Sequence, residues 1–527
     1  MSKKKQVEKS KKMRKEHDDL IENDTTSFNQ LIDMDTAIEM LNTSRTTFYR
    51  WLRAGKIKGM KLGRQWRFYQ EDIKRFLKGQ SPKVELRADI NPLIQALTSK
   101  IEEFGVNDSS KEEDELQIAV NKMILLGILM RATDIHIAPF LSESCNETIA
   151  SIRYRIDGIL HTIVEFDNRL LDRIVEKWKM MAACDIKEEI RPQDGRILIE
   201  LGDQFGFENS EKEEIRNLAG KRIDLRVSFV TSGLGESMTA RILDSSAISL
   251  SLDKIEYSTM DMTKLKNAIH APWGIIVITG PTGSGKTTVV YSCINEIANP
   301  KLKIMTVEDP IEYFLPSVIH TTINQKAGLS FSSALRSILR SDPDVILVGE
   351  IRDLDSLQIA MQSSLTGHLV FTSLHANDTA LALGRMVNIG VDPFVVADAV
   401  KLILSQRLIR KLCPLCSKET TPEKRKLDLI KEYAKSQNFG WDSIEKKFRE
   451  PVGCPKCTYG FKGRNVIAEV LEVTPEIGEA LRKGAEVDEL RNIAISQGMI
   501  PMEMDGLIKA SNGATTLDEI IRILGLR

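Results

Sequence analysis

One short run of the chain has the residue types and order needed to hold a phosphate chain. Residues 280–287 read GPTGSGKT, the complete Gly-x-x-x-x-Gly-Lys-Thr pattern. Glycines let the backbone wrap around phosphate oxygens, and the amides that begin a following helix attract the anion. A lysine in this pattern neutralises the β- and γ-phosphates, and the hydroxyl after it can bind Mg²⁺. The predicted nucleotide-binding residues are Gly280, Pro281, Thr282, Gly283, Ser284, Gly285, Lys286 and Thr287.

The elements around this loop must be a strand before it and a helix after it. The apolar stretch 275–279 precedes the loop, and a helix is predicted over 289–297. A glycine-rich turn without a ligand is the alternative, and it would require neither flank. From residue 260 to about 410, the strand-like segments GIIVITG, KIMTVED, DVILVGE and HLVFTSL are separated by helical patterns. This alternation predicts a doubly wound α/β domain.

Five further polar side chains end or flank the predicted strands of this domain. Glu350 ends DVILVGE, and Glu308 and Asp309 end KIMTVED. Because the carboxyl ends of parallel strands line one crevice, we expect Glu350 to lie near the γ-phosphate and to polarise the attacking water. Glu308 and Asp309 could reach the same crevice. His368 and His375 flank LVFTSL, and both a phosphate-sensing role and a purely structural role are open for them.

Four of the seven cysteines form two Cys-x-x-Cys pairs, Cys413 with Cys416 and Cys454 with Cys457. In a cytosolic chain such pairs indicate a metal site rather than disulfides. Four thiolates can give a tetrahedral Zn–S₄ centre. The 37 residues between the pairs are charged and helix-like. Four unligated thiols are the alternative.

Residues 44–67 hold eight Lys or Arg and no acid. Predicted helices at 33–41 and 44–55, a hairpin and a closing helix at 71–77 outline a winged helix-turn-helix. A DNA-binding surface and a docking face for a protein or an acidic lipid both stay open. The predicted DNA contacts lie on the second helix and the wing: Arg45, Arg50, Arg53, Lys61, Arg64 and Arg67. Three aromatic residues are predicted to build the core of this small domain: Phe48, Trp51 and Trp66.

The whole chain has the composition of a soluble globular protein of several domains. Its 527 residues are 42% apolar and 28% charged, with a net charge of −1, so local rather than overall charge is informative. The longest apolar run, 123–130, is far shorter than the roughly 18 residues that a membrane span needs. The basic N-terminus has no apolar segment after it, so no signal peptide is predicted. We expect a cytoplasmic protein.

Four segments, in this order along the chain, resemble a known family: GPTGSGKT, TVEDPIE, LRSDPDVILVGEIRD and TGHLVFTSLHAN. The chain is similar to the ATPases of type II secretion and type IV pilus assembly from about residue 116 to 527. DIHIAP, YRIDGIL, RPQDGRI and GESMTARIL resemble the family's second N-terminal domain. The segment DMDTAIEML through EDIKRFL resembles the excisionase-type, MerR-like winged helix family.

Composition, pattern and the two resemblances together divide the chain into seven expected parts. They are a disordered basic tail (1–29), a MerR-like winged helix-turn-helix (30–80), a linker (81–115), an α+β domain (116–258), a RecA-like P-loop ATPase core (259–410), a tetracysteine zinc subdomain (411–465) and a C-terminal helical subdomain (466–527). A long exposed loop is expected at 202–220. The overall fold class is therefore multidomain α/β.

The family also implies roles by position. Lys286 and Thr287 match its phosphate loop, Glu350 its catalytic glutamate, and the four cysteines the zinc loop of members that drive assembly and secretion. Glu308 and Asp309 match its "Asp box", and His368 and His375 its "His box". Arg226 and Arg241 match arginines that the preceding domain presents to the nucleotide, which suits guanidinium chemistry. Two surface salt-bridge arginines are the alternative.

The function that the resemblance implies is that of an assembly motor. It would be a homo-hexamer that hydrolyses ATP with Mg²⁺, binds Zn²⁺ and works with an inner-membrane platform protein at the cytoplasmic face of that membrane. The chain departs from the family at Ala138, where an acid is common, and at 30–80, where a platform-docking domain is usual. Two alternatives stay open: a motor whose helix-turn-helix serves DNA uptake or regulation, and a scaffold that does not hydrolyse ATP.

Overall fold

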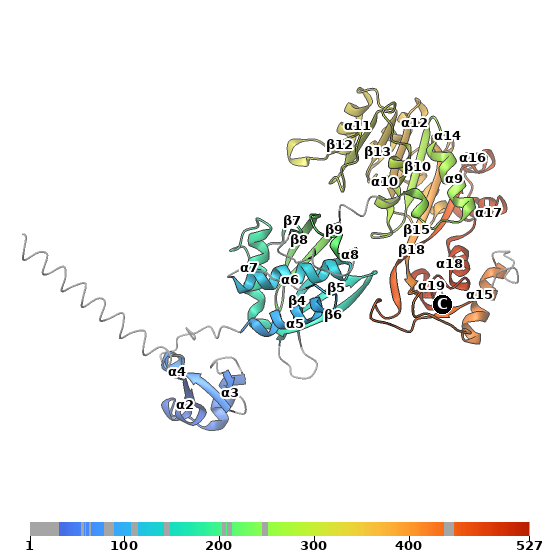
Figure 1. Ribbon diagram of the computed structural model, residues 1–527. Helices are drawn as coiled ribbons and strands as arrows, with labels where there is room; N and C mark the ends of the chain where they lie inside the picture. The colour runs from blue at the N-terminus through green and yellow to red at the C-terminus, as the bar shows by residue number, and fades with distance from the viewer. Residues whose placement is uncertain are drawn as a thin grey trace, which may run out of the picture.

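The fold is seen in a computed structural model that describes residues 31–53, 57, 60–62, 65–77, 89–106, 114–141, 148–202, 207, 213–244, 251–436 and 447–525. Figure 1 shows the parts in chain order, from the winged-helix unit in blue to the C-terminal helices in red. The basic tail predicted at 1–29 lies outside the described residues. No helix within the described part of the chain has the length and hydropathy needed to cross a bilayer.

The N-terminal unit is the predicted winged helix-turn-helix with one additional strand. Its elements are β1 (Leu31–Asp33), α2 (Met34–Met40), α3 (Arg45–Arg53), β2 (Met60–Leu62), β3 (Gln65–Tyr69) and α4 (Gln70–Leu77), with the strands in the order β1-β3-β2. Ser44 caps α3, because its Oγ accepts a hydrogen bond of 3.2 Å from the Thr47 amide. Phe48 and Phe68 are fully buried and meet edge to face at 5.0 Å. Three-residue β1 was not predicted, since it is too short for an alternating pattern.

The next unit is an antiparallel sheet covered by helices. Its strands are β4 (Ala132–Leu141), β5 (Thr148–Ile156), β6 (Ile159–Asp167), β7 (Gln193–Glu200), β8 (Arg222–Ser232) and β9 (Gly235–Asp244), in the order β6-β5-β4-β9-β8-β7. Its helices are α5 (Asn91–Glu102), α6 (Glu115–Leu129), α7 (Leu171–Met181) and α8 (Glu213–Arg216). Helix α6 is apolar nearly all round, so it packs between its neighbours, and the buried Tyr154 hydroxyl donates to the Met123 carbonyl at 2.6 Å.

Two segments of this unit differ from the sequence expectation. Helix α5 lies within 81–115, which was expected to be a linker, and its Leu93, Leu97 and Ile101 are buried in the same core as α6. The acidic run after α5 dominated the composition of that window and obscured a short helical period. Phe207, inside the expected exposed loop, is also buried in this core. Helix α8 also falls within the expected loop, and residues 203–206 and 208–212 lie outside the described part of the chain.

The third unit is the predicted α/β domain. Its strands are β10 (Gly274–Thr279), β11 (Ile304–Glu308), β12 (Val318–Thr322), β13 (Val345–Val348), β14 (Leu369–Leu374), β15 (Val400–Leu412) and β18 (Phe461–Glu472), in the order β12-β11-β13-β14-β10-β15-β18. All neighbours are parallel except β15 and β18. Its helices are α9 (Thr259–Ile269), α10 (Lys286–Ile297), α11 (Phe331–Leu339), α12 (Leu354–Leu365), α13 (Thr379–Ile389) and α14 (Pro393–Ala399). The parallel strands therefore place their carboxyl ends along one edge.

The C-terminal part adds helices and the cysteine-bearing segments. Its further elements are β16 (Lys418–Glu419), α15 (Lys424–Ser436), β17 (Arg449–Glu450), α16 (Pro475–Arg482), α17 (Val487–Ser496), α18 (Met502–Ser511) and α19 (Leu517–Leu524). Helix α15 lies between the two cysteine pairs, and its Ile430 and Ala434 belong to a core that includes Met504 and Leu507. The helix-like pattern between the pairs is thus a packed helix rather than an extended loop.

Candidate nucleotide site and metal centre

The phosphate loop connects β10 to α10 through three glycines in backbone conformations that favour glycine. Gly280, Gly283 and Gly285 have φ of 144°, 76° and 88°. At Gly280 a Cβ atom would come within 2.6 Å of the Ser284 Oγ and 2.7 Å of the Gln406 carbonyl oxygen. A side chain there would displace backbone. The loop can therefore close tightly over an anion only with glycine at this position.

A loop that holds phosphates needs a cation inside it, and Lys286 provides one. Its Nζ donates to the Gly280 carbonyl at 2.8 Å and to the Pro281 carbonyl at 3.1 Å. Burial lowers the pKa of Lys286, and the nearby Glu350 carboxylate opposes that shift. Thr287 is exposed in the first turn of α10, so its hydroxyl is accessible to a cation bound with the phosphates.

Glu350 lies on the same edge of the sheet as the loop. It follows β13 by two residues, its side chain is 23% exposed, and it is ion-paired with Arg352. The His375 Nε2 lies 3.5 Å from its Oε2. Glu350 also lies close enough to Lys286 for its charge to raise the pKa of Lys286, against the effect of burial. The structure thus brings Lys286, Glu350 and His375 together, as the strand order requires.

Glu308, at the end of β11, is held in a buried cluster. Its Oε1 accepts from the Thr306 hydroxyl at 2.6 Å and from His320 Nδ1 at 3.0 Å, and its Oε2 accepts from the Tyr291 hydroxyl. The Leu315 amide donates to His320 Nε2 at 3.0 Å, so the ring proton must lie on Nδ1. Both oxygens of Glu308 are therefore engaged by the protein. The adjacent Asp309 is exposed and lines a cleft with Arg352.

His368 is not brought to this edge. It precedes β14, whereas His375 follows it, so a whole strand separates the two rings. Its Nδ1 donates to the Ser363 carbonyl at 2.8 Å, at the end of α12. This contact secures a helix end on the opposite edge of the sheet. A phosphate-sensing role for His368 stays a prediction without a geometric basis here.

Arg226 and Arg241 face one another across the β8–β9 ladder of the antiparallel sheet. Arg226 forms an ion pair of 2.9 Å with Glu312, which follows β11 in the α/β domain. Arg241 is paired with the buried Asp134 at 3.1 Å. The two arginines are therefore brought together and held by carboxylates. None of the contacts described for them reaches the phosphate loop.

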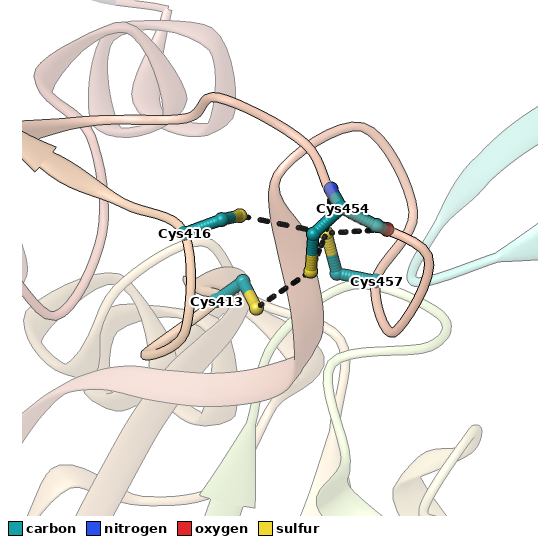
Figure 2. Close-up of side chains that lie close together, drawn as sticks. All are labelled: Cys413, Cys416, Cys454 and Cys457. Atoms are coloured by element: carbon teal, nitrogen blue, oxygen red, sulfur yellow. Dashed lines mark hydrogen bonds between the residues drawn. The ribbon is translucent and has the colours of Figure 1, made fainter.

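The four paired cysteines form one cluster (Figure 2), in which the Sγ atoms all lie within 4.8 Å of one another. The separations are 3.9 Å for Cys413–Cys454, 3.7 Å for Cys416–Cys457 and 3.6 Å for Cys454–Cys457. A tetrahedral centre with Zn–S bonds of about 2.3 Å requires sulfur separations of about 3.8 Å. Four sulfur ligands at this spacing fit zinc.

Comparison with known proteins gives the family. The model of the family described as "Type II/IV secretion system protein" matches residues 109–522. The chain belongs to this family. A second model, described as "Helix-turn-helix domain", matches residues 31–81. Both predicted resemblances are thereby confirmed.

Members of the family similar to this chain include pilus and secretion proteins. The type IV pilus assembly ATPase PilB of Myxococcus xanthus is 35% identical over 458 residues, which cover 86% of this chain and 75% of that protein. The putative type II secretion system protein E of Escherichia coli K12 is 36% identical, over 83% of each chain. The solved structure of the Legionella pneumophila ATPase DotB has the same fold, with a TM-score of 0.54 and 19% identity over 79% of this chain and 98% of that one.

Membership makes this chain an ATPase of the secretion and pilus family, as predicted. The RecA-like core, the preceding α+β unit and the N-terminal helix-turn-helix are present as predicted. Four residues around the site were not predicted: Tyr291, His320, Gln406 and Tyr257. Tyr291 and His320 contact Glu308, Gln406 contacts Ser284, and Tyr257 contacts Gln406. All four lie outside the motifs, so spacing within the motifs gave no signal for them.

Proposed function

We propose that this ATPase is a motor that hydrolyses ATP with Mg²⁺, works as a ring of six copies and drives pilus-type assembly or secretion at the cytoplasmic face of the inner membrane. One observation supports hydrolysis above all: Lys286, Thr287 and Glu350 lie at one edge of the sheet. A scaffold that only binds nucleotide would not need Glu350. The pilus and secretion proteins among the relatives support the cellular role.

In this proposal the residues divide the work of hydrolysis. Lys286 and the amides of the loop hold the phosphates, and Thr287 would hold Mg²⁺, which would neutralise charge on the β- and γ-oxygens. Glu350 orients the attacking water and accepts its proton. His375, 3.5 Å away, and Arg352 fix the carboxylate in position.

Arg226 and Arg241 are proposed to act when the two domains close or when the ring forms. In the described conformation their charges are neutralised by Glu312 and Asp134. A nucleotide phosphate could replace either carboxylate, because guanidinium groups bind both in the same two-pronged geometry. Release of Arg226 from Glu312 would also free the α+β unit from the segment that follows β11.

The test of this motor is turnover measured as a function of protein concentration. Specific activity should rise as the ring assembles, and Arg241→Ala should lower turnover more than ATP affinity. Arg222→Ala is the matched control, because Arg222 lies on the neighbouring strand β8 and is 82% exposed. Full specific activity in a dilute monomer would contradict the proposal.

The cysteine cluster is proposed to bind one Zn²⁺ per chain. Its four sulfur atoms supply a complete ligand set, so no position is left open for catalysis and a structural role follows. Metal analysis should find zinc in the purified protein, and Cys413→Ser should lose it. Cys184→Ser, which alters a thiol outside the cluster, should keep it. A wild-type protein without zinc, purified in the absence of chelators, would refute the site.

A second candidate function is DNA binding by the helix-turn-helix. Arg45 and Arg50 are exposed on α3, whereas Phe48 on the same helix is buried. The helix therefore presents these two cations outward and the Phe48 ring inward, while Tyr49 is also exposed. The other predicted contacts cannot be placed: the side chains of Arg53, Lys61, Arg64 and Arg67 lie outside the described residues. A protein or acidic-lipid partner of the machine would use the same charges.

Duplex DNA binding over a salt series, measured on the full-length protein, distinguishes these partners. DNA binding predicts an affinity that falls steeply with salt and a shallower slope for Arg50→Ala. Arg222→Ala, an exposed cation in another domain, should leave the slope unchanged. No binding at low salt would favour the docking face.

A further inference from the structure

Gln406 on β15 supports the phosphate loop from behind. Its side chain is completely buried, and its Nε2 donates to the Ser284 carbonyl at 2.7 Å. Its Nε2 would also lie 3.0 Å from a Cβ atom at Gly285. Strand β15 pairs with β10 directly before the loop, with Ser405 opposite Thr279. The side-chain amide of Gln406 is therefore hydrogen-bonded to the Ser284–Gly285 peptide of the loop.

This contact fixes the direction of a loop amide. In a planar trans peptide the C=O and the following N–H point in opposite directions. Holding the Ser284 carbonyl toward β15 therefore turns the Gly285 N–H away from β15, toward the interior of the loop. Gly285 is the N-cap of α10, so its N–H is one of the donors that a phosphate at a helix N-terminus uses.

Tyr257 holds Gln406 in turn. The Tyr257 hydroxyl donates to the Gln406 Oε1. The orientation of the amide is unambiguous, because the Ser284 carbonyl can only accept and must face the NH₂ group. Burial raises the pKa of Tyr257 well above its ordinary value, so the phenol stays protonated as a donor.

Tyr257 belongs to the connection between the two domains, of which the structure describes residues 251–258, directly before α9. The preceding residue, Glu256, is attached to the same pair of strands: it accepts from Asn465 on β18 at 2.6 Å and is paired with Lys411 on β15. Two successive residues of the connection are thus fixed on β15 and β18. A movement of the connection would reach Gln406 through Tyr257.

We propose that Tyr257 and Gln406 are positioning residues that couple the connection between the domains to the Gly285 amide of the phosphate loop. When the connection is in place, the amide points into the loop and ATP binds tightly. When the connection shifts as the α+β unit moves, the Ser284 peptide loses its support and the loop holds phosphate less well. This inference rests on ATP binding at the phosphate loop.

The experiment is equilibrium binding of a fluorescent ATP analogue to the full-length protein and to Tyr257→Phe, Gln406→Leu and the double variant. Tyr257→Phe should weaken binding by about 2- to 12-fold, the range for one net hydrogen bond. Gln406→Leu should weaken it at least as much. Because the two residues act in series, the double variant should bind like Gln406→Leu alone. Additive losses, or unchanged binding in both single variants, would overturn the coupling.

Three controls keep the result interpretable. Tyr433→Phe removes a similar hydrogen-bonded phenol, beside Glu503 in the C-terminal core, and should leave binding unchanged. Lys286→Ala tests the loop itself: unchanged binding there would reject the nucleotide site and with it the relay, whereas lost binding there with unchanged Tyr257→Phe would reject the relay alone. Thermal unfolding without nucleotide identifies variants that fail to fold.

Gln406→Glu provides a second readout that a purely structural role would not produce. An ionised carboxylate would place a negative charge against the negative end of the Ser284 carbonyl dipole and repel it, so binding should be weak. Protonation gives the carboxyl group one donor, which can restore the hydrogen bond. Binding by Gln406→Glu should therefore recover as the pH is lowered, relative to wild type. A pH profile parallel to that of the wild type would overturn the proposal.

Discussion

Glu308 ends β11 and Glu350 follows the neighbouring parallel strand β13, so both reach the same edge of the sheet, yet their surroundings differ. Glu308 is 4% exposed and accepts hydrogen bonds from Thr306, His320 and Tyr291. Glu350 has a side chain that is 23% exposed and lies beside Arg352 and His375. The first carboxylate is completely supplied with donors by the protein. The second keeps access to solvent.

The difference bears on which of the two carboxylates is available to act as a general base. A general base must have a lone pair available to the water whose proton it takes. Glu308 would have to give up a buried donor to do so, which carries the cost of an unsatisfied polar group. Glu350 has no such obstacle. The proposal that Glu350, rather than Glu308, activates the attacking water rests on this difference.

The largest expected effect is on turnover in Glu350→Gln. The amide keeps the shape of the side chain and removes the base, so turnover should fall by roughly 10²-fold or more, the scale of general acid–base catalysis. ATP binding and thermal stability should be retained. Glu296→Gln, exposed on α10, should match the wild type. Wild-type turnover in Glu350→Gln would remove the distinction between the two carboxylates.

Glu308→Gln should act on stability first. The glutamine NH₂ group would face a buried donor that hydrogen-bonds to a carboxylate oxygen in the wild type. Two donors would then face each other, and both would be left unsatisfied. The free energy of unfolding should fall by about 1–3 kcal/mol, measured by denaturant unfolding with Glu296→Gln as the control. If Glu308→Gln instead lowered turnover as much as Glu350→Gln with stability unchanged, Glu308 would be the catalytic group.

The smallest expected effect is that of Tyr291→Phe, which removes one of the donors to Glu308. The loss should be about 1 kcal/mol of unfolding free energy, typical of a single hydrogen bond, with turnover changed by less than in Glu350→Gln. The double variant Tyr291→Phe/Glu308→Gln should lose less unfolding free energy than the sum of the two single losses, because both substitutions break the same cluster. Strict additivity would show that Tyr291 and Glu308 act independently.

The sequence predicts the phosphate loop and the geometry of each cysteine pair because each of these is built from residues close together in the chain. GPTGSGKT determines its own backbone, and the Cys-x-x-Cys pairs place two sulfur atoms within one turn. Glu350 was also predictable, since the strand that it ends defines its edge of the sheet. In these cases the chemistry and the geometry are encoded within a few residues of each other.

The parts that the sequence did not predict depend on distant contacts. The support of Ser284 by Gln406 joins residues far apart in the chain, and the cluster around Glu308 includes His320 from the neighbouring strand β12. The two histidines of the "His box" flank one strand, as the sequence predicts, and the structure places only His375 at the edge that carries Glu350. A role for either ring in phosphate sensing stays a prediction.

The pairing of β15 with β18 has a consequence for the cysteine cluster. Leu412 lies opposite Phe461 at the end of this ladder, and the Cys413 amide donates to the Gly460 carbonyl at 2.9 Å. The sheet has therefore already closed the chain loop that contains α15, a closure whose entropic cost grows only with the logarithm of loop length. In small zinc modules the ion itself must offset that cost, and they unfold without it. Here the ion would enter a set of ligands that the sheet has already brought together. Loss of the ion would loosen the two Cys-x-x-Cys segments, while β15 and β18, which carry them, stay paired. The insertion between the two cysteine pairs could also change length without moving the sulfur atoms.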